Sequence, residues 1–141
     1  MTINISPCHI GLIECVTVSP PESGLVMCMG TNRWGQCSVS QAQANHVYSP
    51  IAVQGLQGEV ATHVIAGLQH SGCLTASGRV FFWGKGERGQ LGHGSRDNSH
   101  IPVLVDIDER VKAVSAGLNH TAAVTGEALK HGCVFVVSNS E

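Results

Sequence analysis

A five-residue segment recurs at a fixed spacing in this 141-residue chain. The segment AGLQH at residues 66–70 returns as AGLNH at residues 116–120, an offset of 50 residues. A constant period of this size is typical of modular folds, in which each repeat is one supersecondary unit that packs on its neighbours. The recurrence therefore predicts stacked copies of one unit, not a single compact domain around a buried catalytic centre.

Further correspondences extend this period along the chain. Gly30 matches Gly84, and Gly35-Gln36 matches Gly89-Gln90 without a gap, both at an offset of 54 residues. Pro50, Val53 and Val60 match Pro102, Val105 and Val111 at offsets of 52, 52 and 51 residues. A Pro-rich segment marks an inserted loop in the first copy. The expected repeats are a degenerate one at residues 9–59 with an inserted loop at 19–24, a strong one at 60–110, and an incomplete one at 111–141.

Short apolar runs rich in Val, Phe and Ile alternate with Gly or Ser, a pattern that predicts β-strands. The segment Ala76-Ser77-Gly78 predicts a tight hairpin turn in which Gly78 supplies a positive φ. No segment keeps a 3.6-residue apolar period long enough to predict a helix. The sequence therefore predicts an all-β fold with strands at residues 60–66, 70–75, 79–83, 111–116, 120–125 and 133–137.

The strongest repeat carries the pattern AGxxH at residues 66–70, LT at 74–75, GRVxxWG at 78–84 and GQLG at 89–92. This pattern resembles the repeat of the regulator of chromosome condensation family. Members of that family form seven-bladed β-propellers in which each blade is a four-stranded antiparallel sheet. The resemblance implies that residues 1–141 form a partial β-propeller of two to three four-stranded antiparallel blades. Because so few blades cannot close a seven-bladed ring, we expect a fragment, a truncated isoform or part of an assembly.

The sequence departs from the family pattern at three points. Met29 and Val137 stand where the family has Trp. The pair Lys85-Gly86 replaces a residue followed by Asn, although Asn32 keeps that Asn in the first copy. The middle third of the chain therefore carries the resemblance most strongly.

The repeated histidines are interpreted as structural residues. His70 and His120 occupy equivalent repeat positions, where a ring nitrogen would bond backbone beside the Ala-Gly turn. The ring of Trp83 is expected to fill the space between neighbouring blades, with an exposed partner anchor as the alternative. The residues assigned to the repeat scaffold are Gly67, His70, Gly78, Trp83, Gly84, Gly89, Gln90, Gly92, Gly117 and His120.

Charged side chains crowd the Gly-rich segment that follows Trp83. Loops on one face of a propeller are free to carry binding specificity. The acidic cluster at residues 106–109 is interpreted as a solvated turn, with a charged recognition loop as the alternative. The predicted partner-binding residues are Lys85, Glu87, Arg88, Arg96 and Asp97.

Neither catalytic residues nor a metal or cofactor site is predicted. Only His70 and Cys73 have the spacing of a zinc ligand pair, and no second pair completes four ligands. The order Gly84-x-Gly86-x-x-Gly89 spells a dinucleotide fingerprint, but the residues after it are too Gly-rich for the helix that this fingerprint needs. No nucleophile motif is visible, so we expect no enzyme.

Composition bounds the partners and the location. The net charge is −2, the isoelectric point is near 6.4 and basic residues are scattered, so direct nucleic-acid binding is not expected. No apolar run reaches membrane-spanning length. The first residues lack the features of a secretory signal, and the six cysteines contain no Cys-x-x-Cys. We therefore expect reduced thiols in a cytoplasmic or nuclear protein without membrane contact.

These observations favour a protein–protein interaction scaffold. The alternative, implied by the resemblance, is a regulator of guanine nucleotide exchange on a small GTPase. Either function requires a protein partner and no cofactor. Open blade edges template association, so the isolated chain is also expected to self-associate.

Overall fold

The computed structural model describes the backbone of residues 2–7, 13–19, 24–126 and 134–137, and the side chains of residues 24–126. These residues form strands and turns, with no helix among them. The predicted all-β fold is confirmed. The inserted loop predicted at 19–24 lies mostly outside the described residues, as do Cys8 and Cys133.

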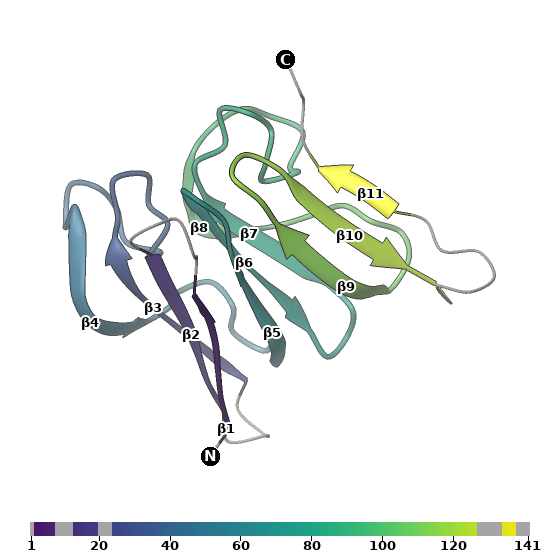
Figure 1. The fold of residues 1–141 in the computed structure, drawn as a ribbon, viewed down its shortest axis with the longest axis horizontal. Coiled ribbons are helices and arrows are strands. Elements are labelled where there is room, and N and C mark those ends of the chain that lie inside the picture. Colours follow the sequence, from purple (N-terminus) through teal and green to yellow (C-terminus); the bar gives the residue numbers. More distant parts are fainter. Residues whose placement is uncertain (1, 8–12, 20–23, 127–133, 138–141) are drawn as a thin grey trace.

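Eleven described strands make three antiparallel sheets, each a meander in which chain neighbours pair (Figure 1). The predicted four-stranded blades are confirmed in the first two sheets, while three strands of the third are described. The first sheet contains β1 (Thr2–Pro7), β2 (Ile13–Ser19), β3 (Leu25–Thr31) and β4 (His46–Ala52). The second contains β5 (Ala61–Ala66), β6 (His70–Thr75), β7 (Val80–Gly84) and β8 (Ser99–Leu104). The third contains β9 (Val111–Ala116), β10 (Thr121–Thr125) and β11 (Val134–Val137).

The sequence predicted no strand before residue 60, so β1 to β4 were missed, and β8 was missed as well. Two of these, β4 and β8, are edge strands of the first two sheets and contain Pro50 and Pro102. Proline removes a backbone donor, so it lowers the strand signal and is tolerated in a sheet mainly at an edge. The same prolines also make these edges poorer templates for pairing with another chain.

The second sheet is packed on both of its faces. Strand β5 lies against β1 and β2, and β9 lies against β5 and β6. All five residues of β7 are buried, and successive side chains of a strand point to opposite faces. Phe81 and Trp83 enter the core shared with the first sheet, whereas Val80 and Phe82 enter the core shared with the third. This double burial explains why the middle of the chain carries a continuous apolar run.

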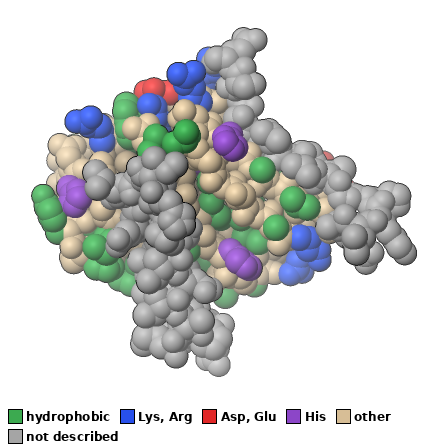
Figure 2. All heavy atoms as spheres, in the orientation of Figure 1, with side chains coloured by type: hydrophobic (Ala, Val, Ile, Leu, Met, Phe, Trp, Pro, Cys, Tyr) green, Lys and Arg blue, Asp and Glu red, His purple; other side chains and the backbone are tan. Residues whose placement is uncertain are grey.

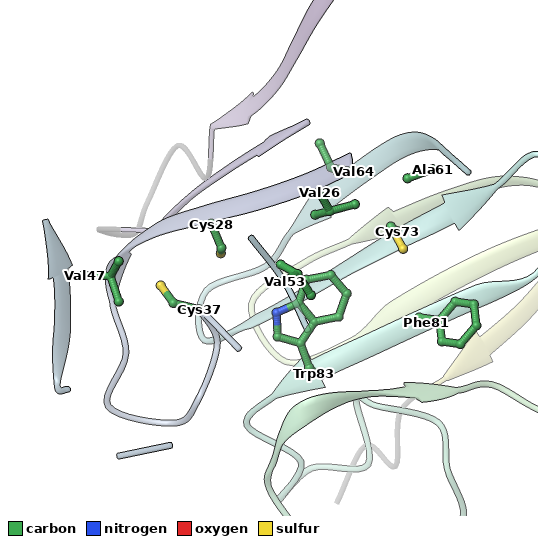
Figure 3. Close-up of a cluster of buried hydrophobic side chains, with 10 residues drawn as sticks. All are labelled: Val26, Cys28, Cys37, Val47, Val53, Ala61, Val64, Cys73, Phe81 and Trp83. Carbon is green, nitrogen blue, oxygen red and sulfur yellow. The ribbon is translucent and has the colours of Figure 1, made fainter. Parts of the chain in front are cut away.

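The core between the first two sheets surrounds the ring of Trp83 (Figure 3). Val26 and Cys28 come from β3, while Val64 and Cys73 come from β5 and β6. Trp83 is 0% exposed, so its whole indole ring contributes to packing between the sheets.

The repeated glycine at the end of the third strand has a steric cause. Gly30 and Gly84 adopt φ values of 112° and 107°, beside the same register irregularity in each sheet. A Cβ atom on Gly84 would lie 2.7 Å from the carbonyl oxygen of Gln69 and 2.9 Å from Cα of His70. Both the dihedral angle and the close backbone therefore require glycine there.

The meander places alternate connections at the same end of the sheets. The backbone N–H of Lys85 donates to the carbonyl of Gln69 at 2.9 Å, and Gly67 lies against the carbonyl of Gly117. We call this end the loop face and define it as residues 32–45, 67–69, 85–98 and 117–120, along the upper side of Figure 1. The opposite end comprises residues 53–60, 76–79 and 105–110.

Candidate functional site: the loop face

Gln36 joins the first sheet to the second at the base of the loop face. Its side-chain Oε1 accepts from the backbone N–H of Trp34 at 2.7 Å, which closes the turn that contains it. Its backbone carbonyl accepts from Ser71 Oγ and from Trp83 Nε1, each at 2.9 Å. Gln36 is 1% exposed, so these bonds are shielded from water and satisfy groups that would be costly to bury unpaired.

Gln90 makes the equivalent junction between the second and third sheets. Its Oε1 accepts from the backbone N–H of Arg88 at 2.8 Å. Its carbonyl accepts from Thr121 Oγ1 at 3.0 Å. The repeated Gly-Gln pair is therefore a turn whose glutamine side chain orders the loop and whose carbonyl receives the next sheet.

His70 extends the second junction. Its Nε2 lies 3.1 Å from Thr121 Oγ1. The Thr121 hydroxyl has one proton and donates it to a carbonyl, so it accepts from His70, which must carry its proton on Nε2. Within residues 24–126, His70 Nδ1 is buried and makes no close hydrogen bond, consistent with a neutral ring. The sequence predicted a bond from a ring nitrogen to backbone beside the Ala-Gly turn. The Nε2 bond goes to a hydroxyl of the neighbouring sheet, and the backbone of His120 also interacts with the ring.

Burial lowers the pKa of His70 from its ordinary value of 6.5 to about 4. The nearby charge of His120 lowers the pKa further. A hydrogen bond with the backbone of His120 raises the pKa, but this is the smallest of the three effects. His120 occupies the equivalent position in the third sheet but is exposed. The two histidines thus share a repeat position and differ in what covers them.

The Ala-Gly turns leave no room for a side chain beside these rings. The N–H groups of Gly67 and Gly117 donate to the carbonyls of His70 and His120 at 2.8 and 2.9 Å. A Cβ atom on either glycine would lie 2.2 Å from the adjacent imidazole Cε1. The remaining scaffold residues lie in turns: Gly78 between β6 and β7 beneath Arg110, and Gly89, Gly92 and their neighbour Gln90 on the loop face.

The five predicted partner-binding residues all lie in the connection between β7 and β8. Glu87, Arg88, Arg96 and Asp97 are exposed. The Asp97 carboxylate accepts from Ser95 Oγ at 3.0 Å. The structure therefore brings these five residues to one end of one sheet.

Lys85 differs from the other four because it is held against the first sheet. Its side chain is 18% exposed, and its ammonium lies 4.3 Å from the centroid of the Trp34 ring. The same ammonium donates to Gln69 Oε1 at 3.1 Å and lies 3.5 Å from Glu87 Oε2. A cation over an indole face, supported by two further contacts, braces three connections of the loop face against one another.

A compensating pair explains why Gly86 stands where the first sheet has Asn32. Asn32 donates to the carbonyls of Val39 and Ala44 at 2.9 and 2.7 Å and so organises its own loop. At Gly86, an added Cβ would lie 2.1 Å from the carbonyl oxygen of Asp97. The Gly86 N–H instead donates to Asn98 Oδ1 at 2.9 Å, so an asparagine from the far end of the loop orders it.

Replacing Asn98 with alanine is expected to lower the free energy of unfolding by about 1 to 2 kcal/mol, because the buried N–H of Gly86 loses its acceptor. Urea denaturation monitored by far-ultraviolet circular dichroism measures the change. The matched control is Asn119→Ala, at an exposed turn position with a predicted change below about 0.5 kcal/mol. Equal effects of the two substitutions would contradict the assigned role of Asn98.

The opposite end of the sheets carries the acidic cluster. Asp106, Asp108 and Glu109 are exposed and line a pocket of about 230 Å³ together with the turn after β6. Arg79 pairs with Glu59, and Arg110 donates to the carbonyl of Ala76 at 2.5 Å. The connection between the second and third sheets is thus held to the β6–β7 turn while its carboxylates remain in solvent.

Among the described residues, no group of three His, Cys, Asp or Glu side chains is placed to hold a metal ion. The same part of the chain contains no helix long and apolar enough to cross a membrane.

Four residues of these junctions were missed by the sequence analysis. They are Trp34, Ser71, Asn98 and Thr121. Ser71 and Thr121 carried a usable signal, because both are hydroxyl residues that directly follow the repeated histidines at the same offset of 50 residues. Asn98 and Trp34 carried none, because the bond of Asn98 to Gly86 and the contact of Trp34 with Lys85 are not repeated in the other copies.

Known proteins resemble this chain in both sequence and fold. Residues 77–124 match the family model of the regulator of chromosome condensation (RCC1) repeat. The chain is 31% identical to the ultraviolet-B receptor UVR8 of Arabidopsis thaliana, over 82% of this chain and 27% of that protein. It is 35% identical to the regulator of chromosome condensation of Mus musculus, over 74% of this chain and 24% of that protein.

A solved structure shows the same fold. Prp20p of Saccharomyces cerevisiae superposes with a TM-score of 0.75 at 21% identity, over 94% of this chain and 32% of that chain. The chain therefore spans about a quarter to a third of each protein that it matches here. The predicted partial β-propeller is confirmed, with the three sheets as its blades.

Proposed function

We propose, since this chain belongs to the regulator of chromosome condensation repeat family, that it is a protein–protein interaction scaffold whose partner binds the loop face. A fold of this kind hosts many functions, so the function depends on the site and not on the architecture. The site offers rigidly presented charged loops.

The observation that carries this proposal is the bracing of Lys85. Its ammonium is fixed by Trp34, Gln69 and Glu87, which belong to three different connections. The neighbouring charges at Glu87, Arg88, Arg96 and Asp97 extend into solvent from the loop that Lys85 anchors. A surface that is ordered before binding loses less conformational freedom when the partner arrives, so more of its contact energy appears as affinity.

The alternative is regulation of guanine nucleotide exchange on a small GTPase. The observation in its favour is the similarity to Prp20p, whose structure was described together with its binding to Gsp1p and histones. A scaffold and an exchange regulator would use the same face of the blades. They differ in whether the partner releases nucleotide after it binds. A cytoplasmic or nuclear location belongs to both proposals.

A nucleotide-release assay against a panel of small GTPases separates these functions. Accelerated release would favour the exchange function, and binding without acceleration would favour the scaffold. For any partner found, the triple substitution of Lys85, Glu87 and Arg88 by Ala is expected to weaken binding by about tenfold or more, because it removes the charges that the loop presents. Surface plasmon resonance measures the dissociation constant.

The control is the triple substitution of Asp106, Asp108 and Glu109 by Ala, which removes exposed charges from the opposite end. It is expected to leave the dissociation constant within about twofold. A larger loss in the control than in the loop-face variant would move the binding site to the opposite end.

A further inference from the structure

We propose that the partner of the loop face is an acidic protein segment, recognised by Trp34 together with Arg33, Arg88 and Arg96. This inference rests on the proposed function and names the partner chemistry for the same face. It adds Trp34 and Arg33, both from the first blade, to the residues of the second blade.

Charge is divided unevenly between the two ends of the blades. On the loop face, Arg33, Lys85, Arg88 and Arg96 stand against Glu87 and Asp97, whereas the opposite end has Arg79 and Arg110 against Glu59, Asp106, Asp108 and Glu109. Figure 2 shows Lys and Arg side chains, with acidic atoms beside them, near the upper side of the molecule, where the loop face lies, and a further basic group at the lower right. The excess of positive charge on this face contrasts with the chain as a whole, whose net charge is −2.

The two acidic residues of the loop face are engaged within it. The Glu87 carboxylate lies 3.5 Å from the Lys85 ammonium, and the Asp97 carboxylate accepts from Ser95. Arg33, Arg88 and Arg96 are exposed. Arginine pairs with carboxylates through two parallel hydrogen bonds, so a partner that carries spaced carboxylates fits this surface.

Trp34 provides the apolar anchor that such a surface needs. It is partly exposed, and the Lys85 ammonium covers one face of its ring at 4.3 Å. Tryptophan and arginine are the residue types most enriched where binding energy concentrates. The exposed part of the Trp34 ring therefore offers an apolar contact on the same face as the exposed arginines.

The repeat geometry holds this anchor and an arginine in equivalent places. Trp34 and Arg88 are 54 residues apart, the same offset that relates Gln36 to Gln90. The backbone N–H of each donates to its glutamine Oε1, at 2.7 Å and 2.8 Å. The two residues therefore stand at the same point of adjacent blades, fixed by the same turn, and present an ordered pair to one partner segment.

The mixed signs of the face favour a protein segment over a nucleic acid. A nucleic acid brings a continuous line of phosphates, which Glu87 and Asp97 would repel. A protein segment can place carboxylates opposite the arginines and a neutral or basic residue opposite the two acids. The same face therefore selects for spaced negative charge.

The experiment uses the full 141-residue chain and a fluorescein-labelled peptide of about ten residues in which glutamate alternates with serine, titrated by fluorescence anisotropy at low and moderate salt. We expect saturable binding that weakens as salt is added, because exposed charge pairs are screened. The triple variant R33E/R88E/R96E is expected to raise the dissociation constant at least about tenfold. Trp34→Ala is expected to raise the dissociation constant several-fold, because it removes the partly exposed indole ring from the binding surface.

The matched control for charge is Lys112→Glu, an equal change of charge on exposed β9, compared with Arg88→Glu alone. Arg88→Glu is expected to weaken peptide binding and Lys112→Glu to leave it within about twofold. Equal losses in these two variants would mean that net charge alone drives the binding, and would overturn the assigned surface.

Two other outcomes would also overturn the inference. One is the absence of saturable peptide binding, and the other is tighter binding of a single-stranded DNA oligonucleotide than of the peptide. Neither outcome would remove the scaffold function, because that function is tested separately by the loss of a GTPase or other protein partner in the Lys85, Glu87 and Arg88 variant. If that variant also keeps its partner, the proposed function itself fails.

Discussion

Replacing Trp83 with alanine is expected to lower the free energy of unfolding by about 4 kcal/mol. The ring is 0% exposed and lies in the core between the first two blades, so its removal opens a cavity that the surrounding strands cannot close. The substitution also removes the Nε1–H donor to the Gln36 carbonyl, although Ser71 still donates to that oxygen. Domains of this size are stable by roughly 5 to 15 kcal/mol, so the loss would be a large share of the total.

Urea denaturation of the purified variants measures this effect. Trp83→Phe keeps most of the ring volume but loses the donor. It is expected to lower the free energy of unfolding by about 1 kcal/mol for the lost hydrogen bond, and by a further amount for the smaller cavity. Trp34→Ala is the matched control, because Trp34 is the other tryptophan and is partly exposed. An equal loss of unfolding free energy for Trp34→Ala and Trp83→Ala would show that the core between the first two blades does not depend specifically on Trp83.

The sequence was sufficient to predict the blades because their signal is repeated and local. The recurrence of the Ala-Gly turn and its histidine located β6 to within one residue, and the apolar run at residues 79–83 located β7. Both strands are buried on both faces, and β7 is apolar without interruption from Val80 to Trp83. The edge strands β4 and β8 escaped prediction, because each contains a proline and faces solvent on one side.

The candidate site could be predicted only in part. The charged loop at residues 85–98 was evident from composition, and the structure places all five predicted residues in it. The bracing of Lys85 by Trp34 was not evident, because the two residues are far apart in sequence and belong to different blades. Contacts between repeats depend on how the blades pack, and a period within the sequence reports only what the copies have in common.

His70 and His120 differ in burial although they occupy equivalent repeat positions. Their shared turn is a local property, and the structure gives both the same contact with glycine. Their burial is a property of the next blade, whose Thr121 covers His70. A residue that looks equivalent by sequence therefore becomes a buried junction or an exposed side chain according to its neighbour.

The buried ring of His70 leads to a pH-dependent stability. Its pKa is lowered from 6.5 to about 4 in the folded chain, chiefly by burial. Between these two values the unfolded chain binds a proton that the folded chain does not, so stability falls as the pH falls through this window. The full stability is present above about pH 6.5, and about 3 kcal/mol of it is expected to be lost by pH 4.

Urea denaturation at pH 7 and at pH 4.5 tests this expectation, with His70→Asn as the comparison. Asparagine can keep a donor near Thr121 but does not titrate, so the variant should be less stable at pH 7 and lose markedly less stability on acidification than the parent chain. The control is His63→Asn, at an exposed position of β5, which should keep the pH dependence of the parent. If the His70 and His63 variants respond to pH alike, the junction between the second and third blades does not depend on a neutral imidazole. A loss of stability on acidification that is larger in the parent and in the His63 variant than in the His70 variant would tie the acid sensitivity to the hydrogen bond that His70 donates across the blades.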